Sequence, residues 1–200
     1  MKAIWLFFLT VLSVNLYGEG YQIGDQASDF RLKNVDGKYV TLADYPNARG
    51  FVVIFTCNNC PYARAYQDRI IALDKEFKSK GFPVIAINPN DPDVEPGDSY
   101  DAMVTRAREK GYPFPYLFDE KHEVYKVYGA TNTPHAYVLQ KNNKGQLIVK
   151  YIGAVDDNFQ DASAVKKSYI RDAINALLSG KEPEPSFTKA VGCGVKSKHV

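Results

Sequence analysis

Two cysteines separated by two residues, Cys57 and Cys60, are the side chains in this 200-residue chain whose type and spacing most clearly suggest chemistry. Thiols at this spacing can form a reversible disulfide, or they can supply half of a structural zinc site. A zinc site needs two further ligands, and only Cys193 and three histidines remain, none of them in a paired spacing. The sequence therefore favours thiol–disulfide exchange, in which one thiolate attacks a disulfide and the second cysteine resolves the mixed disulfide.

The segments around the cysteines predict a strand, a helix and a second strand. Phe51–Phe55 is a continuous apolar run, which is typical of a strand covered on both faces. After the cysteines, apolar residues recur at intervals of three and four and predict an amphipathic helix that ends near Lys80. Val84–Ile87 is the next buried strand, so these segments form a βαβ unit with the cysteines at the first junction.

A helix N-terminus is a favourable place for a reactive thiol. Its free N–H groups and partial positive charge stabilise a thiolate at Cys57, so we expect a pKa between roughly 3.5 and 7.5 instead of about 8.5. Cys60 is expected in the first turn as the resolving thiol, and Pro61 suits this turn because the missing N–H would have had no helical partner.

The rest of the chain predicts an α/β domain. Further elements are a hairpin of 29–32 with 39–42, a helix at 99–110, a strand at 116–118, a short helix at 122–128, a hairpin of 136–139 with 147–149, and a last helix with apolar positions from Val165 to Leu178. The loop between Asn88 and Ser99 carries four acids that do not fit the calcium-loop pattern, so we expect solvated charges there.

The N-terminus predicts export. The apolar run Ala3–Leu16 is too short to cross ~30 Å of hydrocarbon comfortably and is typical of a secretory signal peptide cleaved after Gly18, although an uncleaved anchor is the alternative. The expected organisation is a signal peptide at 1–18, one domain at 19–182 and an extended tail at 183–200 that carries Cys193. We expect a periplasmic or otherwise exported protein with no membrane span after cleavage. The net charge of +2 gives no reason to expect a nucleic-acid partner.

Several segments resemble the exported redoxins of the thioredoxin-like superfamily, which are related to the AhpC/TSA and TlpA groups. The landmarks are 55–62, 86–91, 111–116, Thr133-Pro134, 156–158 and 192–194. The resemblance implies a thioredoxin fold, with a central mixed β-sheet flanked by helices and an N-terminal β-hairpin extension. It implies no organic cofactor and no metal. The partners would be protein or small-molecule thiols and disulfides, together with an upstream dithiol protein as electron donor.

The same resemblance suggests roles for residues outside the cysteine pair. Thr133-Pro134 matches the superfamily's cis-proline, which would present the Thr133 backbone to an extended substrate; a trans proline in a surface turn is the alternative. His135 would either assist proton transfer or lie at a strand edge. Thr56 stands where thioredoxins carry a tryptophan. Cys193 would be a third redox partner, a link to another chain, or a free surface thiol.

The sequence thus predicts an exported thiol–disulfide oxidoreductase that works through Cys57 and Cys60. One alternative is a Cu(I) chaperone in which His135 joins the cysteine pair as a ligand. Another is a thiol-dependent peroxidase with Cys60 at the peroxidatic position. Peroxiredoxins carry a threonine at the position of Cys57 and a proline upstream, and both are missing here. The predicted strand at 51–55 also lacks the buried acid that assists proton transfer in thioredoxin.

Overall fold

The structure is a computed structural model that describes residues 20–198. The predicted signal peptide at 1–18 and its cleavage site lie outside these residues. Between residues 20 and 198, no helix is both long enough and apolar enough to cross a membrane.

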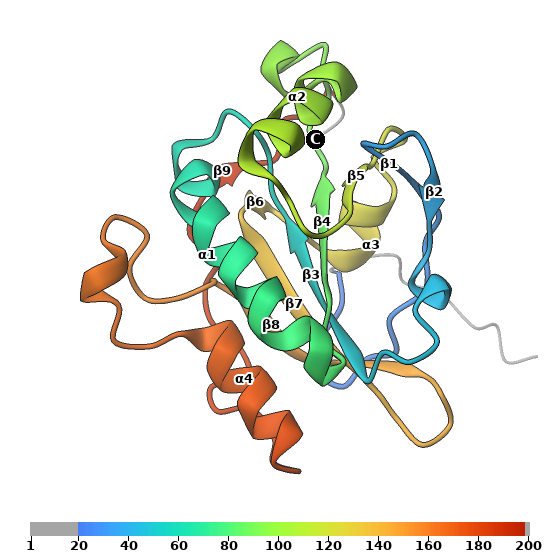
Figure 1. Cartoon of the computed structure of the whole chain (residues 1–200), viewed down its shortest axis with the longest axis vertical. Helices are drawn as coiled ribbons and strands as arrows, with labels where there is room; N and C mark the ends of the chain where they lie inside the picture. Colours follow the sequence, from blue (N-terminus) through green and yellow to red (C-terminus); the bar gives the residue numbers. More distant parts are fainter. Residues whose placement is uncertain (1–19, 199–200) are drawn as a thin grey trace, which may run out of the picture.

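A seven-stranded mixed sheet forms the centre of the domain, in the order β2-β1-β5-β4-β3-β7-β8 (Figure 1). Its strands are β1 (Leu32–Asn34), β2 (Tyr39–Val40), β3 (Gly50–Phe55), β4 (Val84–Asn88), β5 (Tyr116–Phe118), β7 (His135–Lys141) and β8 (Leu147–Gly153). Strand β3 pairs parallel with β4 and antiparallel with β7, so it is enclosed on both edges. All six of its residues are buried, which agrees with its continuous apolar run.

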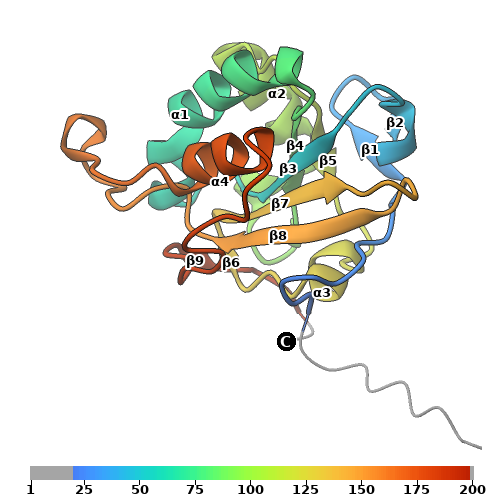
Figure 2. The ribbon, with the colours of Figure 1, turned by 90° about the horizontal axis from the view of Figure 1, so that it is seen from below.

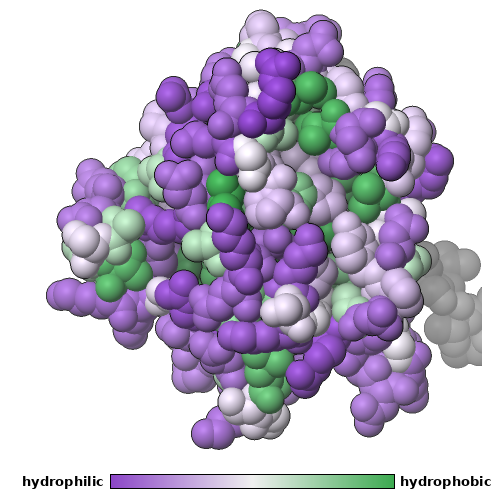
Figure 3. Space-filling view, viewed as in Figure 1, coloured by the Kyte–Doolittle hydropathy of each residue, from purple (hydrophilic) through white to green (hydrophobic). Residues whose placement is uncertain are grey.

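Helices cover both faces of this sheet (Figure 2). The helices are α1 (Pro61–Phe77), α2 (Tyr100–Lys110), α3 (Val124–Tyr128) and α4 (Tyr169–Leu178), and short 3-10 turns occur at Leu42–Asp44, Lys78–Lys80, Pro96–Asp98 and Ala162–Ala164. Helices α1, α2 and α4 pack into one apolar cluster with one face of the sheet. Helix α3 and the N-terminal segment pack into a second cluster on the other face. The surface in Figure 3 is mainly hydrophilic, with hydrophobic side chains in small separate patches.

The predicted mixed sheet with flanking helices and an N-terminal hairpin is confirmed. In the hairpin, Leu32 pairs with Val40, and the strands span Leu32–Asn34 and Tyr39–Val40 instead of the predicted 29–32 and 39–42. Two predicted helix starts were wrong. The last helix begins at Tyr169 and not at Val165, because Val165 follows a separate 3-10 turn with an extended backbone, with φ of −64° and ψ of 124°. The short helix begins at Val124 because His122 has a left-handed backbone, with φ of 55°.

A second sheet of two strands joins segments that are distant in sequence. Strand β6 (Asn132–Thr133) pairs antiparallel with β9 (Cys193–Gly194), so the C-terminal tail returns to the domain beside the start of α1 (Figures 1 and 2). The sequence predicted an extended tail but not this pairing. The tail brings the third cysteine to the other two.

Candidate active site

The two cysteines of the predicted pair lie between β3 and α1. Cys60 is the N-cap residue of α1 and Pro61 is its first residue, so Cys60 precedes the first turn in which it was expected. Cys57 and Cys60 are 3% and 6% exposed, which means that a partner cannot reach either sulfur freely in this state. Thr56 is also buried, and its N–H donates to the carbonyl of Ile87.

The disulfide in this structure joins Cys60 to Cys193, with 6.0 Å between the Cα atoms. Cys57 is a free thiol. The oxidised pair therefore differs from the predicted Cys57–Cys60 disulfide, because β9 places Cys193 against Cys60. Cys57, Cys60 and Cys193 pack in one small cluster, so the Cys60 sulfur has two cysteines nearby with which it could form a disulfide.

Thr133 contacts both members of the predicted pair. Its hydroxyl oxygen lies 3.1 Å from the Cys57 sulfur. Its carbonyl oxygen lies 3.2 Å from the Cys60 sulfur. The Thr133–Pro134 peptide bond is cis, and Thr133 is fully buried beneath β9. Thr133 therefore lies beside the sulfurs of both cysteines, and its role and that of Pro134 in substrate binding stay predictions.

The pKa of the Cys57 thiol is raised from 9.0 to about 11. Burial is the largest cause, and the nearby Asp98 carboxylate adds to it. Hydrogen bonds from Thr133 and from the backbone N–H groups of Cys60 and Asn59 lower the pKa by less. The expected thiolate stabilisation is therefore present but is outweighed by desolvation, so the prediction of a lowered pKa was wrong for this state.

A buried acid lies beside the cysteine loop, in a segment where the sequence predicts solvated charges. Asp98 has no exposed surface. It accepts hydrogen bonds from the Asn58 N–H and the Asn90 side-chain amide, both at 2.6 Å, and from the Asn59 N–H. Because no cation neutralises it among these contacts, desolvation raises its pKa. Nothing in the local sequence distinguished Asp98 from its exposed neighbour Asp93.

His135 lies on β7, paired with Phe55, and stacks on Tyr137 with ring centres 5.0 Å apart. Burial lowers its pKa to about 4. The ring lines a cavity of about 600 Å³ together with Thr131 and tail residues 187–190. Across residues 20–198, no three His, Cys, Asp or Glu side chains are grouped so that they could hold a metal ion. The Cu(I) alternative therefore lacks the predicted third ligand in the described part of the chain.

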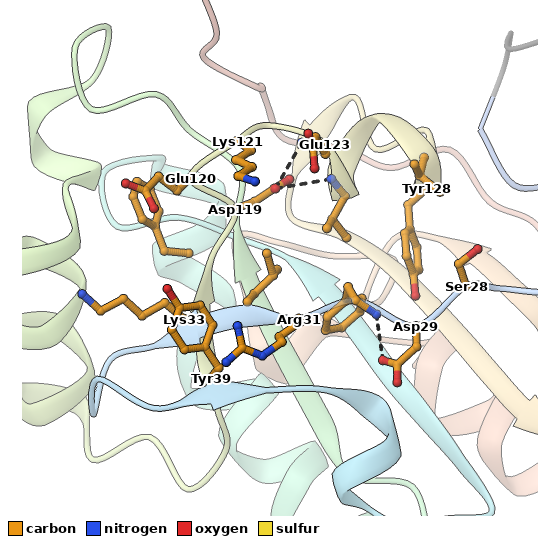
Figure 4. Close-up of a pocket in the computed structure, with 15 residues that line it drawn as sticks. Ser28, Asp29, Arg31, Lys33, Tyr39, Asp119, Glu120, Lys121, Glu123 and Tyr128 are labelled. Carbon is orange, nitrogen blue, oxygen red and sulfur yellow. Dashed lines mark hydrogen bonds between the residues drawn. The ribbon is translucent and has the colours of Figure 1, made fainter.

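A second cavity, of about 460 Å³, lies between the N-terminal hairpin and α3 (Figure 4). Its lining includes Arg31, Lys33 and Lys121 as well as several acids, and none of the three cysteines. Asp119 points to the start of α3 and accepts hydrogen bonds from the N–H groups of residues 123–125. These bonds give this carboxylate a structural role.

The fold and the cysteine cluster define an oxidoreductase of the thioredoxin-like class. Residues 23–152 match the AhpC/TSA family, and the chain belongs to that family. A crystal structure of an uncharacterized conserved protein from Geobacillus kaustophilus is 36% identical, covers 93% of this chain and 95% of its own, and has a TM-score of 0.81.

Two more distant similarities agree with this class. Thiol-disulfide oxidoreductase ResA of Geobacillus thermodenitrificans is 23% identical over 171 residues, which are 82% of this chain and 92% of that protein. The structure of a putative thiol:disulfide interchange protein DsbE from Chlorobium tepidum is 23% identical, covers 64% of this chain and 82% of its own, and has a TM-score of 0.52. The second similarity supports the thioredoxin fold alone.

Proposed function

We propose that this protein is an exported thiol–disulfide oxidoreductase that exchanges disulfides through Cys57 and Cys60. The observation that carries the proposal is the free Cys57 thiol packed in one cluster with a disulfide on Cys60. The similarity to ResA, which is named for this activity, supports the assignment. The partners are thiols and disulfides of proteins or small molecules.

The proposed cycle starts from the reduced protein. The Cys57 thiolate attacks one sulfur of a partner disulfide, whose S–S bond breaks, and the partner's second sulfur leaves as a thiolate and takes a proton. The Cys60 thiolate then attacks the Cys57 sulfur, and the first partner sulfur leaves. The products are a partner dithiol and a Cys57–Cys60 disulfide. An upstream dithiol protein would return the two electrons.

Neighbouring residues fit supporting roles in this cycle. Thr133 and Pro134 would hold the partner segment beside the sulfurs, since Thr133 already contacts both. Pro61 starts α1 directly after Cys60. His135 has no step in the proposed cycle, because its Nδ1 accepts a hydrogen bond from the Thr131 N–H and its ring lines the cavity of about 600 Å³ beside Thr131.

Export remains part of the proposal and depends on the N-terminal sequence. A signal peptide at 1–18 would leave a redoxin domain at 19–182 and the tail at 183–200 in the periplasm or another exported location. Reversible disulfides are compatible with such an oxidising space.

Insulin reduction tests the exchange activity. We expect Cys57→Ser and Cys60→Ser each to lower turnover by at least about 100-fold, because the first removes the attacking thiol of the proposed cycle and the second its resolving thiol. Cys193→Ser is the matched control, since it removes the third cysteine and leaves the proposed pair intact. Unchanged turnover in both active-site variants would overturn the proposal.

The Cys60–Cys193 disulfide also favours a second candidate, thiol-dependent peroxide reduction. Peroxide would oxidise the Cys60 thiolate to a sulfenic acid, and the Cys193 thiol would condense with it, releasing water and forming the observed disulfide. In that case Cys193→Ser leaves Cys60 open to overoxidation, which mass spectrometry detects after peroxide treatment. If Cys60 stays unoxidised and peroxide is not consumed, this candidate is wrong.

A further inference from the structure

The tail docks on β6 mainly through backbone hydrogen bonds. Thr133 pairs with Cys193 and Asn132 with Gly194. The Val195 N–H donates to the Thr131 carbonyl at 3.0 Å, and the Asn132 side-chain amide donates to the Gly192 carbonyl at 3.0 Å. These contacts bind the extended backbone of the tail on both sides of Cys193. They do not involve the side chains of the tail residues next to Cys193.

The contacts continue after the cysteine and hold the tail in register. The Lys196 N–H donates to the side-chain oxygen of Asn90, and the Lys196 carbonyl accepts from the Asp91 N–H. Before the cysteine, the Thr188 N–H donates to the Ile152 carbonyl. The cysteine therefore reaches Cys60 from a segment that is fixed at both ends.

The two glycines that flank Cys193 differ sharply in the space around them. A Cβ atom at Gly192 would lie 2.2 Å from the Thr133 carbonyl oxygen and 2.6 Å from its carbon. These are backbone atoms and cannot move aside as a flexible side chain would. A Cβ atom at Gly194 would have nothing within 4 Å. The edge of β6 therefore leaves no room for a side chain at the position before Cys193. It leaves room for a side chain at the position after Cys193.

The resemblance already assigns the Thr133 backbone to an extended partner segment; we propose that this edge of β6 selects segments in which glycine directly precedes the reacting cysteine. The chain's own Gly192–Gly194 segment occupies this edge while the Cys60–Cys193 disulfide is present. The inference rests on the proposed oxidoreductase function and adds the class of substrate. Because Thr133 contacts both Cys57 and Cys60, a partner cysteine in the register of Cys193 lies beside both reacting sulfurs.

An internal exchange releases the tail without an external reductant. The Cys57 thiolate attacks the Cys60 sulfur, the Cys60–Cys193 bond breaks, and a Cys57–Cys60 disulfide forms. The Cys193 sulfur leaves as a thiolate and takes the proton that Cys57 released. The electrons balance, because one disulfide and one thiol are present before and after the step.

Two model peptides test the docking preference. Both carry one cysteine blocked as a mixed disulfide with glutathione and are otherwise identical, one with Gly-Cys-Ala and the other with Ala-Cys-Gly. We expect the reduced protein to react at least about 10-fold faster with the Gly-Cys-Ala peptide. In the Ala-Cys-Gly peptide, the alanine Cβ before the cysteine would overlap the Thr133 backbone, and this overlap weakens docking by about the same factor.

The outcomes separate the two proposals. Equal peptide rates with normal insulin reduction overturn the docking preference and leave the oxidoreductase function standing. Failure to reduce insulin and failure to react with both peptides together overturn the oxidoreductase function.

Two variants of the full chain test the same edge independently of catalysis. In a glutathione redox buffer, mass spectrometry of trapped samples measures the equilibrium constant for the Cys60–Cys193 disulfide. We expect Gly192→Ala to lower this equilibrium constant by at least about 10-fold. The matched control Gly194→Ala adds the same methyl group into open space. Its equilibrium constant for the Cys60–Cys193 disulfide should stay within about 2-fold of that of the unmodified chain. Equal effects of the two variants contradict the proposed docking geometry.

Discussion

The N-termini of α1 and α3 use buried carboxylates in different ways. At α3, Asp119 accepts the N–H groups of residues 123–125 itself. At α1, Asp98 binds the N–H groups of Asn58 and Asn59 in the preceding loop, and the N–H groups of Asn59 and Cys60 also donate to the Cys57 sulfur. One carboxylate caps a helix, and the other positions the loop that carries a thiol.

Only the start of α1 carries cysteines, and its N–H donors are divided between the Asp98 carboxylate and the Cys57 sulfur. At α3, the Asp119 carboxylate occupies the N–H groups of residues 123–125. At α1 some donors remain directed at sulfur, but the charge of Asp98 and the burial of the site oppose ionisation of the thiol. Burial, with a smaller contribution from Asp98, thus keeps Cys57 protonated near neutral pH.

The largest expected effect follows from removing the buried acid at α1. Asp98→Ala leaves buried N–H donors of Asn58, Asn59 and Asn90 without their acceptor, so we expect a loss of about 4 kcal/mol in the free energy of unfolding. Urea denaturation measures this loss. The control is Glu95→Ala, which removes an acid from the same loop whose hydrogen bond to Asn59 is at the surface and which should cost less than ~0.5 kcal/mol. Equal losses would show that Asp98 does not hold the loop.

The next effect concerns the reactivity of Cys57. With a pKa of about 11 instead of 9.0, the thiolate fraction near pH 7 is about 100-fold lower than for an unperturbed cysteine, and it rises with pH until it levels off above pH 11. The rate of iodoacetamide labelling at Cys57 in the Cys60–Cys193 disulfide form measures this profile. Asp98→Asn removes the neighbouring charge and should move the midpoint to lower pH. A midpoint at or below pH 8 in the unmodified chain would contradict the proposed balance between burial and hydrogen bonding.

The smallest effect is expected at α3. Asp119→Ala removes the acceptor of three backbone N–H groups, and we expect a loss of about 2 kcal/mol in the free energy of unfolding, the upper range for a helix cap. The labelling profile of Cys57 should not change. Glu120→Ala, an exposed acid next in sequence, is the control. A shift of the Cys57 profile in Asp119→Ala would show that the two helix starts are coupled.

The central part of the fold was predictable because its periodicity is strong. The buried strand at β3 and the amphipathic α1 follow directly from apolar spacing, and together they place the cysteines between strand and helix. Strands β6 and β9 were not predicted, because each has two residues and no pattern indicates that they pair. The burial of Asp98 was not predicted for a related reason, since an acid in a polar loop gives no local sign that it is buried.

By itself, the sequence determined which atoms can react and where they stand on the local structure: two thiols at the junction of a buried strand and a helix. Only the tertiary structure decided that Cys60 bonds to Cys193, 133 residues away, and that Cys57 remains protonated. Both outcomes depend on interactions between distant segments. The tail strand brings the third sulfur into contact, and the surrounding packing removes the water that would stabilise a thiolate.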